Sequence, residues 1–112
     1  MKRALFIGRW QPLHDGHRWL FNQKLEQDIP ILIAVRETDV DTSNPFTTEQ
    51  VIENLEKEYS EQVGNGTVKI ISIPDIESVN YGRGVGYQIN EFVPPGDISR
   101  ISATAIRKNL KN

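Results

Sequence analysis

The chain is organised around ten residues near its start, Gly8-Arg9-Trp10-Gln11-Pro12-Leu13-His14-Asp15-Gly16-His17. The apolar run Ala4-Leu5-Phe6-Ile7 comes directly before them, and a helical pattern of apolar residues follows over 16–27. These residues are therefore expected to form the turn between a buried strand and a helix. Ligands of open α/β sheets bind at such turns, in the crevice outside the carboxyl ends of the strands.

Within this turn, the glycines and the proline shape the backbone, and the two histidines carry the chemistry. Gly8 allows a tight turn or the close approach of a ligand, and Pro12 stiffens the loop. Gly16 is expected to open the helix and to leave N–H groups free for an anion. His14 and His17 are expected to lie at the same crevice, and both imidazoles can donate hydrogen bonds to phosphate oxygens.

The histidine pair has two other interpretations. A histidine is often an ordinary core or surface residue. A zinc site is the second alternative, but the chain has no cysteine and no third histidine to complete it. Phosphate contact is therefore favoured, and no metal held by protein ligands alone is expected.

The composition is typical of one small globular domain spanning residues 1–112, with 38% hydrophobic and 25% charged residues. A net charge of −2 gives no electrostatic basis for binding nucleic acid. The apolar run near the start is too short for a signal peptide, and no run reaches the length of a membrane span. A cytoplasmic protein is expected, and a domain this small gains buried area by forming a homodimer.

Two further apolar runs, over 31–35 and 68–73, predict strands parallel to the first, because right-handed crossovers connect them. Between them, Thr47 and Gln50 form a capping-box pattern that starts a helix. Additional strands are expected over 88–93 and 98–101. The predicted fold is a small Rossmann-like three-layer α/β/α sandwich with a mostly parallel sheet of four or five strands.

Three charged residues are candidates for contact with a second substrate. Arg36 and Asp39 follow the second strand, in the expected ligand crevice, and Arg83 lies in the glycine-rich run 81–87. Solvated loop charges are the alternative interpretation. The glycines of 81–87 do not match a dinucleotide fingerprint, because their spacing is Gly-x-Gly-x-Gly and no long helical pattern follows.

A second motif, Ile101-Ser102-Ala103-Thr104-Ala105-Ile106-Arg107, stands near the end of the chain. Ser102 is a natural N-cap for a helix, and a helix N-terminus with hydroxyls at Ser102 and Thr104 suits phosphate oxygens. Arg107 lies one helical turn beyond Thr104 and presents a fork for two phosphate oxygens. Capping alone would also account for Ser102.

Together the two motifs resemble the two signatures of the nucleotidylyltransferase superfamily, His-x-Gly-His and Ile-Ser-Ser/Thr-Thr-x-x-Arg, with Ala103 in place of the second hydroxyl residue. The Gly-Arg-aromatic-Gln-Pro opening is most similar to the archaeal-type nicotinamide mononucleotide adenylyltransferases. The segment Asn44-Pro45-Phe46-Thr47 is similar to a segment of the same group. Cytidylyltransferases usually have Thr-Phe-Asp in place of Arg9-Trp10-Gln11.

The resemblance implies a role for each matching residue. His14 and His17 would contact the triphosphate and stabilise charge while the α-phosphate is attacked, and Arg107 completes the catalytic set. Magnesium would accompany the nucleotide. The implied nucleotide-binding residues are Gly8, Arg9, Trp10, Gln11, Gly16, Ser102 and Thr104, with the backbone of 8–10 against the nucleotide.

The implied reaction transfers a nucleoside monophosphate from ATP or CTP to a small phosphorylated acceptor and releases pyrophosphate. ATP is favoured over CTP by the Arg9-Trp10-Gln11 opening. The chain is shorter than the adenylyltransferases that it resembles, so the acceptor stays open. The alternative is a nucleotide-binding module or sensor that has the same fold and no catalytic activity.

Overall fold

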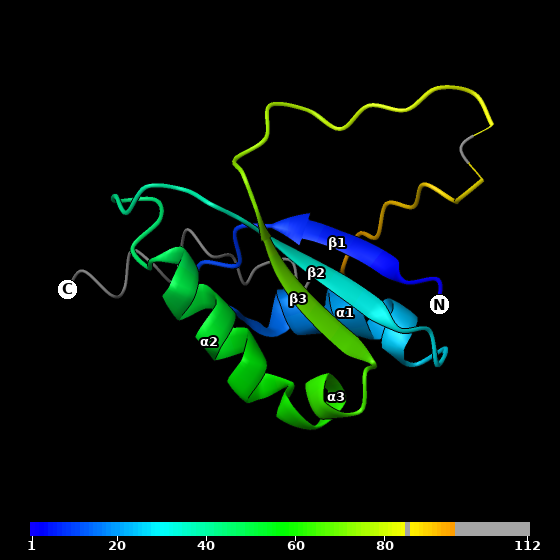
Figure 1. The fold of residues 1–112 in the computed structure, drawn as a ribbon, viewed down its shortest axis with the longest axis horizontal. Coiled ribbons are helices and arrows are strands. Elements are labelled where there is room, and N and C mark those ends of the chain that lie inside the picture. Colours follow the sequence, from blue (N-terminus) through cyan, green and yellow to red (C-terminus); the bar gives the residue numbers. More distant parts are fainter. Residues whose placement is uncertain (85, 96–112) are drawn as a thin grey trace.

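The computed structural model describes residues 1–84 and 86–95. Strands and helices alternate along this part of the chain, and the three strands form one parallel sheet in the order β1-β2-β3 (Figure 1). This confirms the predicted α/β class and the parallel sheet. The elements are β1 (Ala4–Gly8), α1 (Asp15–Leu25), β2 (Ile31–Arg36), α2 (Thr48–Glu58), α3 (Ser60–Gly64) and β3 (Val68–Ile73).

The capping box that predicts the second helix is confirmed at atomic detail. Thr47 Oγ1 accepts a hydrogen bond from the backbone N–H of Gln50 at 3.1 Å, and Gln50 Oε1 accepts one from the N–H of Thr47 at 2.8 Å. Two of the N–H groups at the start of α2 thereby find partners. The helix is interrupted at Tyr59 (φ −114°, ψ 31°), so the expected single helix is divided into α2 and α3.

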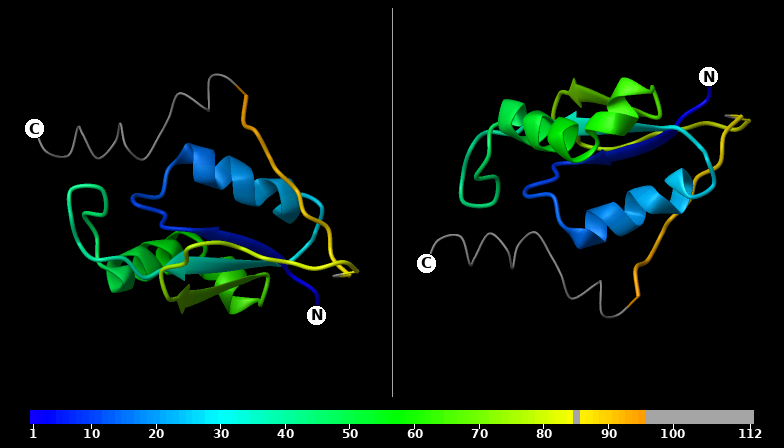
Figure 2. Two further views of the ribbon diagram at one scale, coloured as in Figure 1. Left: turned by 90° about the horizontal axis from the view of Figure 1, so that it is seen from above. Right: turned by 90° about the horizontal axis from the view of Figure 1, so that it is seen from below.

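The core lies on one face of the sheet. Alternate strand residues point to the same face, and the strand register places Phe6 beside Ile33 and Ile33 beside Ile70. Phe21 of α1 is fully buried, and its ring lies 5.3 Å from that of Phe6 and 5.9 Å from that of Tyr59 at the end of α2. Both α1 and α2 therefore pack on this same face. In Figure 2, α1 (blue) lies alongside the sheet and α2 (green) overlaps the strands in projection.

The described residues thus form two of the three expected layers. Two right-handed crossovers that move across a sheet in the same direction place their helices on the same side. Within residues 1–84 and 86–95, no helix covers the opposite face, where Leu5 remains 55% exposed.

The predicted strand over 88–93 is wrong. Residues 88–95 contain no strand, and Ile89 and Val93 are 60% and 73% exposed. This segment passes beside α1 instead of joining the sheet, with Lys24 Nζ 5.9 Å from the centre of the Phe92 ring. Its few apolar residues were not enough to predict pairing, because strand pairing depends on the neighbours that a segment meets. The strand expected over 98–101 lies outside the described residues.

The helices in the described part of the chain are all too short or too polar to cross a membrane.

Candidate active site

The loop between β1 and α1 begins with a close backbone approach at Gly8. A Cβ placed on Gly8 would lie 2.9 Å from Cε2 and Cζ2 of Trp10. The Trp10 side chain is only 5% exposed, and its Nε1–H donates to the carbonyl of Ala34 at 3.2 Å. Trp10 also has a positive φ of 54°. The indole therefore belongs to the core, and any contact of Trp10 with a nucleotide would come from its backbone.

Replacing Gly8 with alanine is expected to destabilise the fold by about 1–3 kcal/mol, because the new methyl group must push the Trp10 ring away from its carbonyl partner. Urea unfolding measures this change. Gly82→Ala is the matched control, since nothing lies within 4 Å of a Cβ there. Equal stability of the two variants would contradict the close contact.

The two histidines form a stacked pair at the start of α1. Their ring centres are 3.7 Å apart and the ring planes are inclined by 20°. His14 is the N-cap residue, and its Nδ1 accepts a hydrogen bond from the N–H of Gly16 at 3.0 Å. The N–H of His14 donates to Nδ1 of His17 at 3.3 Å. Because each Nδ1 accepts a backbone proton, each neutral ring carries its own proton on Nε2.

This arrangement corrects the prediction for Gly16. The helix begins at Asp15, and the N–H of Gly16 is bonded to His14 rather than left open for an anion. The ring N–H donors that these hydrogen bonds leave without a partner are therefore the two Nε2–H groups. His17 is held further by its edge-on contact with Trp10, at 4.9 Å between ring centres.

Both histidines are kept neutral. Burial, followed by the neighbouring His14 and Arg18, lowers the pKa of His17 to about 3. Burial, followed by Arg18, also lowers the pKa of His14. The charge of Arg18 is itself engaged by Glu58 and Asp15. The pair can therefore donate hydrogen bonds near neutral pH without carrying positive charge.

A second loop, over 41–46, is fastened to this turn by two side chains. Gln11 is 2% exposed, its Nε2 donates to the carbonyl of Phe46, and its Oε1 accepts from the N–H of Phe46, both at 2.9 Å. Arg9 donates from Nη1 to Oδ1 of Asn44 at 3.2 Å. Both partners lie 35 positions away along the chain. Gln11 thus joins the two loops. The sequence predicted only that Gln11 contacts the nucleotide, and not this structural role.

The three candidates for the second substrate have different surroundings. Arg36 donates to Asp75 Oδ1 at 3.0 and 2.6 Å and to the carbonyl of Ile76 at 3.3 Å, so it holds the segment after β3. Asp39 and Arg83 are exposed. Among the described residues, no hydrogen bond or ion pair joins these three side chains to one another. Ser102, Thr104 and Arg107, the second motif, lie outside the described residues.

Sequence reasoning missed Asp41 and Asn44, the residues that support Arg9. The only signal for them was the similarity of Asn44-Pro45-Phe46-Thr47 to a family segment. Asp75, the partner of Arg36, was missed in the same way. The contacts of Arg9 with Asn44 and of Arg36 with Asp75 join residues 35 and 39 positions apart, which local patterns do not reveal.

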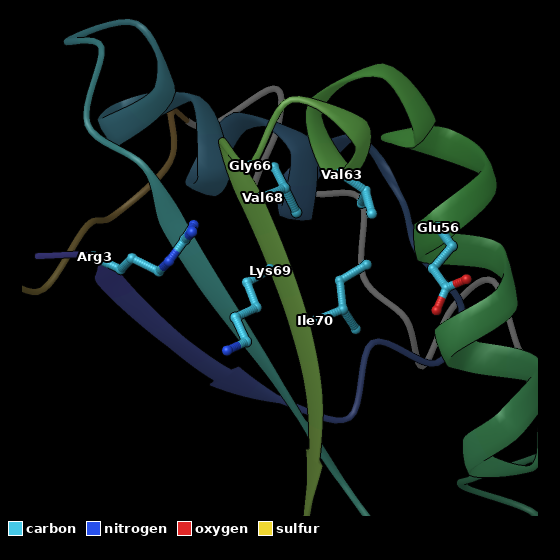
Figure 3. Close-up of a pocket in the computed structure, with 7 residues that line it drawn as sticks. All are labelled: Arg3, Glu56, Val63, Gly66, Val68, Lys69 and Ile70. Carbon is cyan, nitrogen blue, oxygen red and sulfur yellow. The ribbon is translucent and has the colours of Figure 1, made fainter. Parts of the chain in front are cut away.

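Two cavities of about 310 and 320 Å³ lie at the other end of the molecule. The first is bordered by Arg3, Lys69 and Glu56 near the amino ends of the strands (Figure 3). Arg3 already donates to the carbonyls of Ile31 and Thr67, at 3.2 and 3.4 Å. The histidines follow the carboxyl end of β1, so neither cavity belongs to their site.

No family model matches the chain. Three curated proteins that are similar to it share one name. The chain is 30% identical over 99 residues to a nicotinamide-nucleotide adenylyltransferase of Thermococcus sibiricus, covering 86% of this chain and 52% of that protein. It is 31% identical over 101 residues to the protein of that name from Thermococcus onnurineus, covering 87% and 51%. It is 34% identical over 110 residues to the one from Methanococcus aeolicus, covering 96% and 60%.

The chain spans about half the length of the curated relatives that it matches. The matched part includes most of this chain, and the parallel α/β sheet agrees with the fold that the resemblance implies. The similarity over most of the chain, together with the parallel α/β sheet, supports the nucleotidylyltransferase superfamily, close to the archaeal nicotinamide-nucleotide adenylyltransferases.

Proposed function

We propose that the chain transfers AMP from ATP to a small phosphorylated acceptor and releases pyrophosphate. The observation that carries this proposal is the stacked pair of neutral histidines, whose Nε2–H groups are left as donors at the carboxyl end of β1. The names of the relatives support the same chemistry, since each is a nicotinamide-nucleotide adenylyltransferase. ATP is preferred to CTP as the donor.

The reaction requires no nucleophile from the protein. A phosphate oxygen of the acceptor forms a bond to the α-phosphorus of ATP, and the bond from that phosphorus to the bridging oxygen breaks. Pyrophosphate leaves with the electron pair. The protein contributes by positioning the two substrates and by stabilising the charge that develops on the phosphate oxygens.

In this proposal, His14 and His17 donate hydrogen bonds to the triphosphate without losing or gaining a proton. The Arg9 guanidinium adds positive charge from the same loop. Ser102, Thr104 and Arg107 are proposed to hold the β- and γ-phosphates, and Gly8 and Gly16 to lie near the nucleotide. Arg36, Asp39 and Arg83 are kept as proposed contacts of the acceptor.

Magnesium is proposed to enter with ATP. No group of three histidine or carboxylate side chains that could hold a metal occurs within the part of the chain that the structure describes. Magnesium usually keeps several waters and binds through substrate phosphates, so the proposed ligands are phosphate oxygens of ATP and water. Bound in this way, magnesium would offset the negative charge of the triphosphate.

The proposal also includes a cytoplasmic location, a homodimer and no nucleic-acid partner. A non-catalytic nucleotide sensor is the alternative, and the complete histidine pair argues against it.

Thermal unfolding with ATP, CTP or AMP, each with magnesium, tests nucleotide binding. ATP at about 100 times its dissociation constant is expected to stabilise the fold by about 2.7 kcal/mol and to raise Tm by several degrees. Pyrophosphate release with nicotinamide mononucleotide and other small phosphates then tests catalysis. Stabilisation without release by any acceptor would favour the sensor, and no stabilisation by any nucleoside triphosphate would contradict both.

A further inference from the structure

The loop over 41–44 is closed by one carboxylate. Asp41 Oδ1 accepts hydrogen bonds from the backbone N–H groups of Ser43 and Asn44, at 2.8 and 2.7 Å, and from Nδ2 of Asn44 at 3.2 Å. The N–H of Asp41 donates to the carbonyl of Asn44 at 2.9 Å. These bonds, the Asn44 backbone first, lower the pKa of Asp41, and the Arg9 charge acts in the same direction. Asp41 therefore holds Asn44 as an ionised carboxylate near neutral pH.

The Asn44 side chain can take only one orientation in this loop. It is 6% exposed, and its Nδ2 points to the Asp41 carboxylate. Its Oδ1 is therefore turned to Arg9, where it accepts from Nη1 at 3.2 Å. The result is a chain of contacts from carboxylate to amide to guanidinium.

Arg9 keeps its charge available for a ligand. In residues 1–84 and 86–95, Arg18 and Arg36 form ion pairs with carboxylates, and Arg9 forms none. A guanidinium has five N–H donors, so the bond to Asn44 leaves others for phosphate oxygens. A carboxylate in the place of Asn44 would hold Arg9 equally well, but it would also neutralise it. An amide fixes the direction of the guanidinium without forming an ion pair with it, and the Asp41 carboxylate bonds to Asn44 rather than to Arg9.

We propose that Asn44, held by Asp41, is a positioning residue that directs the Arg9 guanidinium to the triphosphate of ATP. This inference rests on the proposed function. Asn44 acts through Arg9 and does not itself touch the nucleotide. Substitution of Asn44 should therefore change the affinity for ATP only while Arg9 is present.

A double-mutant cycle on ATP affinity tests this dependence in the full chain. Asn44→Ala is expected to weaken ATP binding about 10-fold, the effect of losing a hydrogen bond to a charged group. In the Arg9→Ala background the same change is expected to alter ATP affinity by less than about 2-fold. Asn54→Ala, an exposed asparagine on α2, is the matched control and should leave affinity unchanged.

A charge exchange separates positioning from loop structure. Asp41→Asn combined with Asn44→Asp retains hydrogen-bonding groups at both positions but places a carboxylate on Arg9. This double variant is expected to keep the wild-type Tm and to lose about 10-fold in ATP affinity, with a smaller loss for AMP. It also serves if Asn44→Ala does not fold.

Three results would overturn the inference. Equal losses from Asn44→Ala with and without Arg9 would show that Asn44 acts by another route. Unchanged ATP affinity in Asn44→Ala and in the charge exchange would show that it has no such role. If the unmodified chain binds no ATP, the proposed function fails first, and this inference fails with it.

Discussion

His17→Ala is expected to lower the rate of pyrophosphate release from ATP by about 100-fold or more. The change removes an Nε2–H donor whose direction is fixed by the hydrogen bond at Nδ1 and by the Trp10 contact. Removing one fixed donor to a developing charge costs an enzyme about 100- to 1,000-fold in rate. Steady-state measurement of pyrophosphate release with a working acceptor gives the comparison.

Two further variants separate the chemical role of His17 from its structural one. Asparagine places an amide oxygen near the former Nδ1 position, so His17→Asn should keep the contact with the His14 N–H and much of the stability. It has no donor at the Nε2 position and should be as slow as His17→Ala. Glutamine reaches the Nε2 position with an N–H group, so His17→Gln should keep more of the rate. A wild-type rate in His17→Asn would contradict the proposed role of the Nε2–H group.

The features that could be predicted from the sequence are those that depend on residues close together along the chain. The apolar runs 4–7, 31–35 and 68–73 correspond to β1, β2 and β3. Thr47 and Gln50 stand three positions apart, so their capping box could be read directly. The histidines are equally close along the chain, and their position at the start of a helix after a strand was predicted.

The remainder depends on contacts between distant parts of the chain. Gln11 meets Phe46, and Arg9 meets Asn44, across 35 positions. No local sequence pattern predicts these pairs. The tautomer of each histidine follows from the backbone donor at its Nδ1, which only the folded geometry reveals. The strand predicted over 88–93 failed for the same kind of reason, since its apolar residues meet no strand to pair with.

Acidification is expected to destabilise the protein well above the pH range in which most carboxylates titrate. The pKa of His17 is lowered from its ordinary value of 6.5 to about 3 in the folded state, mainly by burial. Between these values the unfolded chain binds a proton that the folded chain does not. The stabilisation is therefore complete above pH 6.5 and is lost progressively as the pH falls towards about 3.

One such proton changes the free energy of unfolding by about 1.4 kcal/mol per pH unit. Between about pH 6.5 and pH 5, His17 alone should therefore lower the free energy of unfolding by about 2 kcal/mol, and the lowered pKa of His14 acts in the same direction.

Urea unfolding at a series of pH values measures how steeply the free energy of unfolding falls with pH. His17→Asn should flatten this slope because the amide does not titrate. A wild-type slope no steeper than that of His17→Asn would mean that the folded protein accepts the proton. The hydrogen bond from the His14 N–H to Nδ1 of His17 would then break, since a protonated Nδ1 can no longer accept.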